Sequence, residues 1–227
     1  MSSSYHTGSH VHVIKRGGRG LPIVKNDSDR YRFLKCLYFL NDANHPTPWE
    51  RDVDKVDSGL HFRRPENWSG DRDPLVAIHA YCLLDNHFHL LLEEVHESGI
   101  PELLRSLSRS MTNYYNKRYD GRGSIFQGEP KYKIIDSDEY LVNAQLYIAV
   151  KNPMEKFAGG LKAAIESFDE AYDFACGYQF CSLADHIGKR NSPILANDSK
   201  SAFPQEGHRE LAREFMRDGK FRYRDNT

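Results

Sequence analysis

The residues of this chain best suited to catalysis are two histidines in an apolar stretch, LLDNHFHLLLEE, which spans Leu83–Glu94. We predict that this stretch contains a strand. Because side chains on a strand alternate between its two faces, His87 and His89 would point the same way and Phe88 would point into a core. Two imidazoles side by side on a rigid strand are suitable ligands for a divalent metal. A half-buried strand with two hydrogen-bonded histidines explains a bare His-x-His equally well. The residues around the motif must therefore decide between this alternative and a metal site.

A second His-x-His pair lies near the N-terminus in HVHVIK, residues 10–15. Its alternation of histidine and aliphatic residues predicts a strand, and we place His10 and His12 on the solvent side. The basic loop RGGRG follows, where glycines let backbone amides approach a phosphate and Arg16 and Arg19 add charge. A plain turn is the equal alternative for this loop.

Length and composition limit the class of protein. A chain of 227 residues forms one large domain or a domain with an appendage. The net charge of −1 gives no global basic signature, so any nucleic-acid surface must be local. None of the 4 cysteines forms a CxxC pair, and we interpret Cys36 and Cys82 as small core residues. Without a signal peptide or an apolar run long enough to span a bilayer, the chain is expected to be cytoplasmic.

Periodicity and turn residues predict the elements of residues 1–153. The predicted strands are 10–15, 75–84, the histidine strand and 132–136. The predicted helices run from Asp27 or Ser28 to Leu40, which follows the first strand, from Ser98 to Tyr119, which follows the histidine strand, and from Ser137 to Asn152, which follows the last strand. The last helix is expected to end at Asn152 because Pro153 follows. The turn pair Asp85-Asn86 makes the two middle strands a hairpin. This order predicts an α+β fold with a ferredoxin-like antiparallel sheet and helices packed on it.

Residues 41–74 form a long polar stretch rich in Pro, Asp and Gly, which we interpret as a loop insertion. It contains both tryptophans, Trp49 and Trp68. Exposed aromatic side chains could stack on bases, but we favour the alternative that they pin the loop to the body.

Basic and aromatic residues interleave from 105 to 133, along the long predicted helix and the turn-rich segment GRGSIFQGEPKYK. This is the best candidate for a nucleic-acid contact surface, and a solvated helix face is its rival. The basic residues assigned to it are Arg105, Arg109, Arg122, Lys131 and Lys133.

Three spaced motifs now support a family assignment: LLDNHFHLLLE, SIFQG and DEYLVNAQLYIAVKNP. Together they resemble the single-tyrosine HUH transposases of the small insertion-sequence type, most closely the REP-associated tyrosine transposases. The resemblance covers roughly Tyr5 to Pro153 and includes the opening strand with its RGGRGLPIV continuation. It implies an HUH endonuclease-like catalytic domain over 1–153 and a C-terminal extension over 154–227.

The resemblance also implies a reaction. In this family the two histidines, here His87 and His89, hold Mg²⁺ or Mn²⁺ at the scissile phosphate of single-stranded DNA, commonly beside a hairpin. A helix-borne tyrosine, here Tyr147, attacks the phosphorus and forms a 5′-phosphotyrosyl intermediate, which keeps the bond energy for rejoining. Relatives act as single chains or as dimers, so a homodimer stays open. The alternative nucleophiles are Tyr114, Tyr115 and Tyr140.

One position departs from the family pattern. The third metal ligand, commonly Asn, Gln or His, stands one helical turn after the tyrosine, where this chain has Lys151. Asn152 comes one residue later, about 100° further around the helix, and reaches the site only if its side chain swings back or a π-bulge absorbs the extra residue. Asn143 is a less favoured substitute. Lys151 could instead grip the scissile phosphate.

The extension predicts helices over 154–185, a polar Pro/Ser-rich stretch over 188–206, and a last charged helix over about 206–218. It could grip a DNA hairpin, dock another chain or cap the core. Two functions outside strand transfer stay open. One is a domesticated nucleic-acid-binding protein that keeps the fold without cleavage, and the other is a metal-dependent hydrolase of small phosphoesters.

Overall fold

The computed structural model describes residues 5–53, 62–197, 199 and 207–219. Its centre is a four-stranded sheet in the order β2-β3-β1-β4, in which every pairing is antiparallel. The strands are β1 (His10–Arg16), β2 (Val76–Leu83), β3 (His87–Glu94) and β4 (Lys131–Ile135). The two central strands are β1 and β3, so both His-x-His pairs lie in the middle of the sheet. The predicted ferredoxin-like α+β fold is confirmed.

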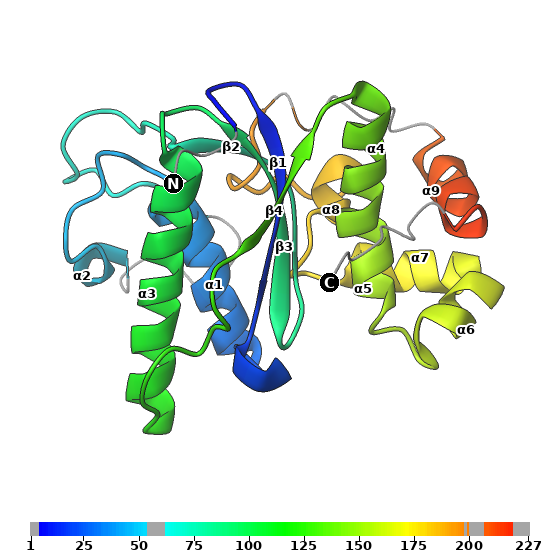
Figure 1. Ribbon diagram of the computed structural model, residues 1–227, viewed down its shortest axis with the longest axis horizontal. Coiled ribbons are helices and arrows are strands. Elements are labelled where there is room, and N and C mark those ends of the chain that lie inside the picture. Colours follow the sequence, from blue (N-terminus) through cyan, green and yellow to red (C-terminus); the bar gives the residue numbers. More distant parts are fainter. Residues whose placement is uncertain (1–4, 54–61, 198, 200–206, 220–227) are drawn as a thin grey trace.

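The sheet separates two helical layers, which Figure 1 shows on either side of the strands. One layer contains α1 (Asp27–Phe39) and α3 (Gly99–Tyr119), which cover the core formed by Val11, Val13 and Phe88. The other layer begins with α4 (Asp138–Leu146). It continues through η2 (Tyr147–Lys151), α5 (Asn152–Met154), α6 (Gly160–Glu166), α7 (Phe168–Gly177), α8 (Leu183–His186) and α9 (His208–Arg217).

The helices of residues 154–217 share one core with the second face of the sheet. Their buried side chains form a single cluster with Leu91 of β3 and Ile148 of η2. The segment before α8 also extends the sheet, because Cys181 bridges to Cys82 in antiparallel fashion. Of the alternatives raised for the extension, this packing matches a cap over the core. No helix in the described ranges is long and apolar enough to cross a membrane.

Helix ends follow the sequence in part. The Ser137 hydroxyl accepts a hydrogen bond from the Tyr140 amide and caps α4, as expected. Asn26, one residue earlier than predicted, caps α1. α3 begins at Gly99, directly after Ser98 as expected, although Ser98 has φ 64° and its side chain makes no cap hydrogen bond.

The prediction that the helix from Ser137 ends at Asn152 is wrong. The chain widens into the π-helical turn η2 and then continues as α5, which contains Pro153. Proline is tolerated there because it lies at the start of a new α-helical segment, where its missing N–H would lack an intrahelical acceptor.

The 41–74 segment is attached to the body through its aromatic residues. Trp49 and Trp68 are both buried, and their rings lie 5.8 and 5.7 Å from that of Phe39. Between them lie α2 (Glu50–Val53) and residues 54–61, which fall outside the described residues. The tryptophans therefore pin this segment to α1, as we favoured over exposed base stacking. A short 3-10 helix, η1 (Gly18–Gly20), lies in the RGGRG loop.

Candidate active site

The histidines of β3 lie where the sequence predicted, with Phe88 turned to the opposite face. Phe88 is fully buried, and its ring lies 5.0 Å from that of Phe33 in the α1 layer. His87 and His89 face the α4 layer, and their ring centroids are 5.1 Å apart. Both line a cavity of about 420 Å³. Its other lining residues are Arg16, Gly20, Asn86, Gln127, Tyr147, Lys151 and Glu155.

Hydrogen bonds orient both imidazoles. Nδ1 of His87 lies 2.7 Å from Oδ1 of Asn86, and Nδ1 of His89 lies 2.9 Å from Nε2 of His12. With each Nδ1 engaged, Nε2 remains as the ligand atom of each ring. Hydrogen bonds of this kind fix ring orientation at metal sites. The donor set therefore fits a divalent ion whose remaining ligands come from other groups.

His12 is a site residue that the sequence prediction missed. We placed it on the solvent side of β1, but it is buried, and its ring centroid lies 5.2 Å from that of His89 and 5.8 Å from that of Tyr147. The prediction failed because the second helical layer covers this face. Strand alternation shows which residues share a face but not whether a distant helix packs on it.

The buried histidines are held neutral. Burial, together with the charge of Lys133, lowers the pKa of His12 to about 3. Burial also lowers the pKa of His89 well below its usual range, with smaller contributions from His12 and His87. Because a neutral imidazole keeps the lone pair that binds a metal, this environment favours ligation.

Tyr147 lies directly against these histidines. It is the first residue of η2 and is 6% exposed, and its ring centroid lies 5.6 Å from that of His89. It lines the same cavity as both β3 histidines. The cavity thus brings a phenol and two imidazoles together from segments about 60 residues apart in the sequence.

Lys151 occupies the place at which the family pattern has a third ligand. Its Nζ lies 3.4 Å from Oη of Tyr147 and 4.6 Å from the centroid of that ring, and it also pairs with Glu155. Burial alone lowers the pKa of Lys151, but the hydrogen bond and charge of Glu155 and the nearby Tyr147 outweigh it, so the net pKa is raised. Lys151 is therefore a cation beside the phenol and cannot ligate a metal.

The π-bulge considered for Asn152 is present, but the amide side chain does not line the cavity. The Asn152 N–H donates to the Tyr147 carbonyl, five residues back, as a π turn requires. The Asn152 side chain is fully buried, and both its Oδ1 and Nδ2 lack a hydrogen-bond partner among the described residues. The carboxylate that does line the cavity is Glu155. Asn143, the other substitute, is not among the lining residues.

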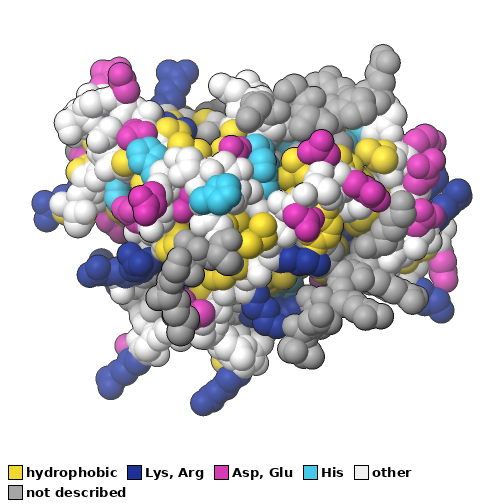
Figure 2. All heavy atoms as spheres, turned by 45° about the horizontal axis from the view of Figure 1, so that its top comes forward, with side chains coloured by type: hydrophobic (Ala, Val, Ile, Leu, Met, Phe, Trp, Pro, Cys, Tyr) yellow, Lys and Arg dark blue, Asp and Glu magenta, His cyan; other side chains and the backbone are white. Residues whose placement is uncertain are grey.

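The basic residues assigned to DNA are divided between the two layers. Arg16 lines the cavity, while Arg19 is exposed in η1 beside the lining residue Gly20. Lys133 lies opposite His12 in the β1–β4 register and Lys131 opposite Ile14, so both lysines share the face of the site. Arg105 and Arg109 belong to α3 on the other face, and Arg122 lies exposed in the loop after α3. The structure therefore does not bring all members of the predicted surface together. On the face shown in Figure 2, lysine and arginine side chains are likewise dispersed.

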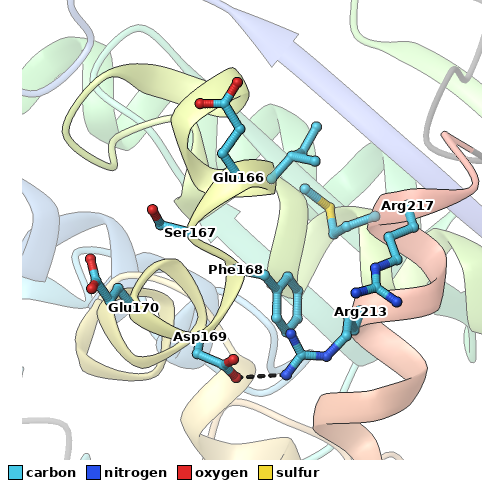
Figure 3. A pocket seen from close by; sticks show the side chains of 9 residues that line it. Glu166, Ser167, Phe168, Asp169, Glu170, Arg213 and Arg217 are labelled. Carbon is cyan, nitrogen blue, oxygen red and sulfur yellow. Dashed lines mark hydrogen bonds and ion pairs between the residues drawn. The ribbon is translucent and has the colours of Figure 1, made fainter.

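A separate hollow between α7 and α9, shown in Figure 3, also contains arginines. It has a volume of about 290 Å³. Arg213 pairs with Asp169 at 2.7 Å and lies 4.6 Å from the Phe168 ring, so its charge joins α9 to α7. These contacts hold α9 against α7 at a solvated interface between the two helices.

Comparison with known proteins adds one finding. A solved structure described as the REP-associated tyrosine transposase bound to a REP hairpin matches with a TM-score of 0.50 and 14% sequence identity. The match covers 88% of this chain and 92% of that chain, so it includes residues beyond 153. No protein-family model matches the sequence. No curated protein matches it either. The structural match shows that the two proteins share a fold.

Proposed function

We propose that this protein is a metal-dependent nuclease and strand transferase of single-stranded DNA, a transposase that acts at or near DNA hairpins. The observation that carries the proposal is the convergence of Tyr147 with His87 and His89 in one cavity, with Lys151 at the tyrosine hydroxyl. The shared fold with a hairpin-bound tyrosine transposase supports the same reading.

His87 and His89 would hold Mg²⁺ or Mn²⁺ through Nε2. When bound, the ion supplies positive charge that neutralises the non-bridging oxygens of the scissile phosphate. His12 keeps the His89 ring oriented, and Asn86 does the same for His87. Arg16, at the cavity wall, would add a bidentate contact to the phosphate.

Tyr147 would attack the phosphorus in line with the leaving 3′ oxygen. The bond from Oη to phosphorus forms, the bond from phosphorus to the 3′ oxygen breaks, and that oxygen leaves as a hydroxyl. The Lys151 ammonium, 3.4 Å from Oη, stabilises the negative charge of the phenolate and then of the phosphate oxygens. Attack by a 3′-hydroxyl reverses the step and rejoins DNA without ATP.

The remaining protein ligand is assigned here to Glu155 in place of the predicted Asn152. A carboxylate is a preferred ligand of Mg²⁺ and Mn²⁺, and Glu155 lines the cavity whereas Asn152 does not. Glu155 pairs with Lys151 in this structure. Binding of DNA would let Lys151 turn to the phosphate and leave the carboxylate for the ion.

The second candidate is a nucleic-acid-binding protein of the same fold that has lost cleavage. The replacement of the family's third ligand by Lys151 is the observation that favours it. It predicts retained hairpin binding and metal affinity without a covalent product.

The test is to incubate the protein with Mn²⁺ and a labelled pool of single-stranded DNA hairpins and to analyse the products on a denaturing gel. We expect a DNA-linked protein band that Tyr147→Phe and His87→Ala both abolish, while Tyr140→Phe, a matched change two turns earlier in α4, retains it. A band that survives Tyr147→Phe would move the nucleophile to another tyrosine. Binding without any band would support the second candidate.

A further inference from the structure

A second cluster of metal-ligating side chains lies on the same sheet face, at the other end of β1 and β3. His10, the first residue of β1, is directly opposite Glu93 in the register, and His79 comes from β2. The Nε2 atoms of His79 and His10 lie 2.9 and 3.6 Å from the same oxygen, Oε2 of Glu93. The three ligand atoms all lie within 4.8 Å of one another.

His79 comes two residues after Ala77, which lies opposite Glu93, so strand alternation places it on the face of this cluster, and a β-bulge interrupts β2 at this residue. The β2–β3 register passes from Ile78 opposite Leu92 to Ala80 opposite Leu91, which leaves His79 as the extra residue. Bulges commonly redirect a side chain beside a functional site. Without this shift, Ala80 would fall on the opposite face from the one on which it is buried.

The C-terminal extension fixes the orientation of the His79 ring. The hydroxyl of Ser199, which is buried, lies 2.9 Å from Nδ1 of His79 and 3.4 Å from the carbonyl oxygen of Ile78. The Ala196 amide donates to the same Ile78 carbonyl. With Nδ1 engaged, Nε2 of His79 is the atom that faces Glu93, which is the arrangement found around histidine metal ligands.

We infer that His10, His79 and Glu93 form a second divalent-metal site, with Zn²⁺ as its preferred ion. Two imidazoles and one carboxylate are a common three-ligand set for zinc, with water as the fourth ligand. Ligands about 2.0–2.1 Å from a tetrahedral ion are roughly 3.3 Å apart. The separations of 2.9 and 3.6 Å lie on either side of that value. Mg²⁺ would be a poor occupant because it prefers oxygen ligands.

The cluster is accessible to an ion. The side chains of His10 and Glu93 are each 28% exposed, whereas His79 is nearly buried. This end of the sheet comes forward in Figure 2, where histidine and acidic side chains both reach the surface. The site is also separate from the active site, because the four residue steps of β3 from His89 to Glu93 span about 13 Å.

A bound ion would tie four segments together: the start of β1, the bulge of β2, the end of β3 and, through Ser199, the C-terminal extension. Its expected role is structural, and it does not depend on DNA cleavage. The site is therefore testable whether or not the protein is a transposase.

The experiment uses metal-free, tag-free protein in a background of His87→Ala with His89→Ala, which removes the two histidine ligands proposed for the active site. Zn²⁺ is titrated in competition with a chromogenic chelator, and Co²⁺ is titrated while the visible absorption of tetrahedral cobalt is recorded. We expect one equivalent of Zn²⁺, a tetrahedral cobalt spectrum, and a higher Tm with Zn²⁺ than without.

Glu93→Gln and His10→Ala should each weaken Zn²⁺ binding at least tenfold and remove the Tm increase. The matched control is His96→Ala, because His96 pairs with Asp73 at 2.8 Å but has no second histidine partner described beside it. That control should bind Zn²⁺ as the background does. The Tm of metal-free Glu93→Gln reports whether this variant folds.

Two outcomes would overturn the site: absence of bound Zn²⁺ in the background, or binding that neither Glu93→Gln nor His10→Ala weakens. Failure of the proposed transposase function has a different signature, which is the absence of a DNA–tyrosine adduct in the wild type.

Discussion

The two histidine clusters of this protein share strands and a sheet face but differ in burial and charge. In the cluster of His12, His87 and His89, the helical layer buries the rings of His12 and His89, Tyr147 packs on both, and Lys151 lies at the tyrosine hydroxyl. In the cluster of His10 and His79, the rings are nearer to solvent and converge on a carboxylate.

The difference shows that the residues around a histidine pair decide its chemistry. The buried cluster has few oxygen ligands of its own, so an ion there would draw them from a phosphate, which suits catalysis. The second cluster carries its own carboxylate and has an orienting hydroxyl behind one ring, which suits a resident ion. Four predictions test this contrast, beginning with the largest effect.

The first prediction separates the two faces of β3. Phe88→Ala should lower the free energy of unfolding by about 3–5 kcal/mol, because it empties a buried ring position in the core. His87→Ala, next to it on the other face, should cost less than about 1 kcal/mol, since its ring is only partly buried. Denaturant unfolding measures both. Equal losses would mean that the histidine face also serves mainly to stabilise the fold.

The second prediction concerns the lysine of the buried cluster. Lys151→Gln should slow adduct formation about 10- to 100-fold while hairpin affinity changes little, because it removes a charge that acts on the reacting oxygens. The matched control is Lys156→Gln, which removes a neighbouring lysine that pairs with Asp85 at 2.7 Å. Single-turnover rates and binding isotherms separate the two effects. A loss of hairpin affinity as large as the loss of rate would mean that Lys151 only binds DNA and does not act on the reacting oxygens.

The third prediction asks whether His12 positions the active-site metal. His12→Phe fills the same space without the hydrogen bond to His89 and should weaken Mn²⁺ binding at the active site about tenfold. It should leave Zn²⁺ binding at the site of His10, His79 and Glu93 unchanged. Titrations of Mn²⁺ by electron paramagnetic resonance and of Zn²⁺ by chelator competition measure these affinities. Loss of both would indicate that His12 supports the whole sheet face.

The strands and the direction of the two β3 histidines could be predicted from the sequence because both depend on local information. Alternation places Phe88 opposite His87 and His89, and Asp85-Asn86 marks the hairpin. The order of strands and helices then limits the fold to few topologies. Those features were confirmed.

Other features depend on contacts between distant segments, which the sequence pattern does not contain. His12 became a buried site residue because α4 and η2 cover its face. A bulge at His79 shifts the β2–β3 register by one residue, so that both His79 and Ala80 lie on the face of Glu93. The π turn at Tyr147–Lys151 allows the helix to pass Pro153 and leaves Asn152 away from the cavity wall.

The fourth prediction uses a buried histidine outside both clusters to measure what burial does by itself. His208, at the start of α9, is buried, and its Nδ1 lies 2.8 Å from the Tyr172 hydroxyl. Burial lowers its pKa to about 4, whereas the unfolded chain has a histidine pKa of about 6.5. Between these values only the unfolded state binds the proton, so stability is present above pH 6.5 and is lost as the pH falls toward 4. His208→Gln should reduce the slope of unfolding free energy against pH in this window by about 1.4 kcal/mol per unit. Tyr172→Phe, which keeps the imidazole and removes its partner, should retain the slope, and an unchanged slope in His208→Gln would mean that His208 is protonated in the folded state.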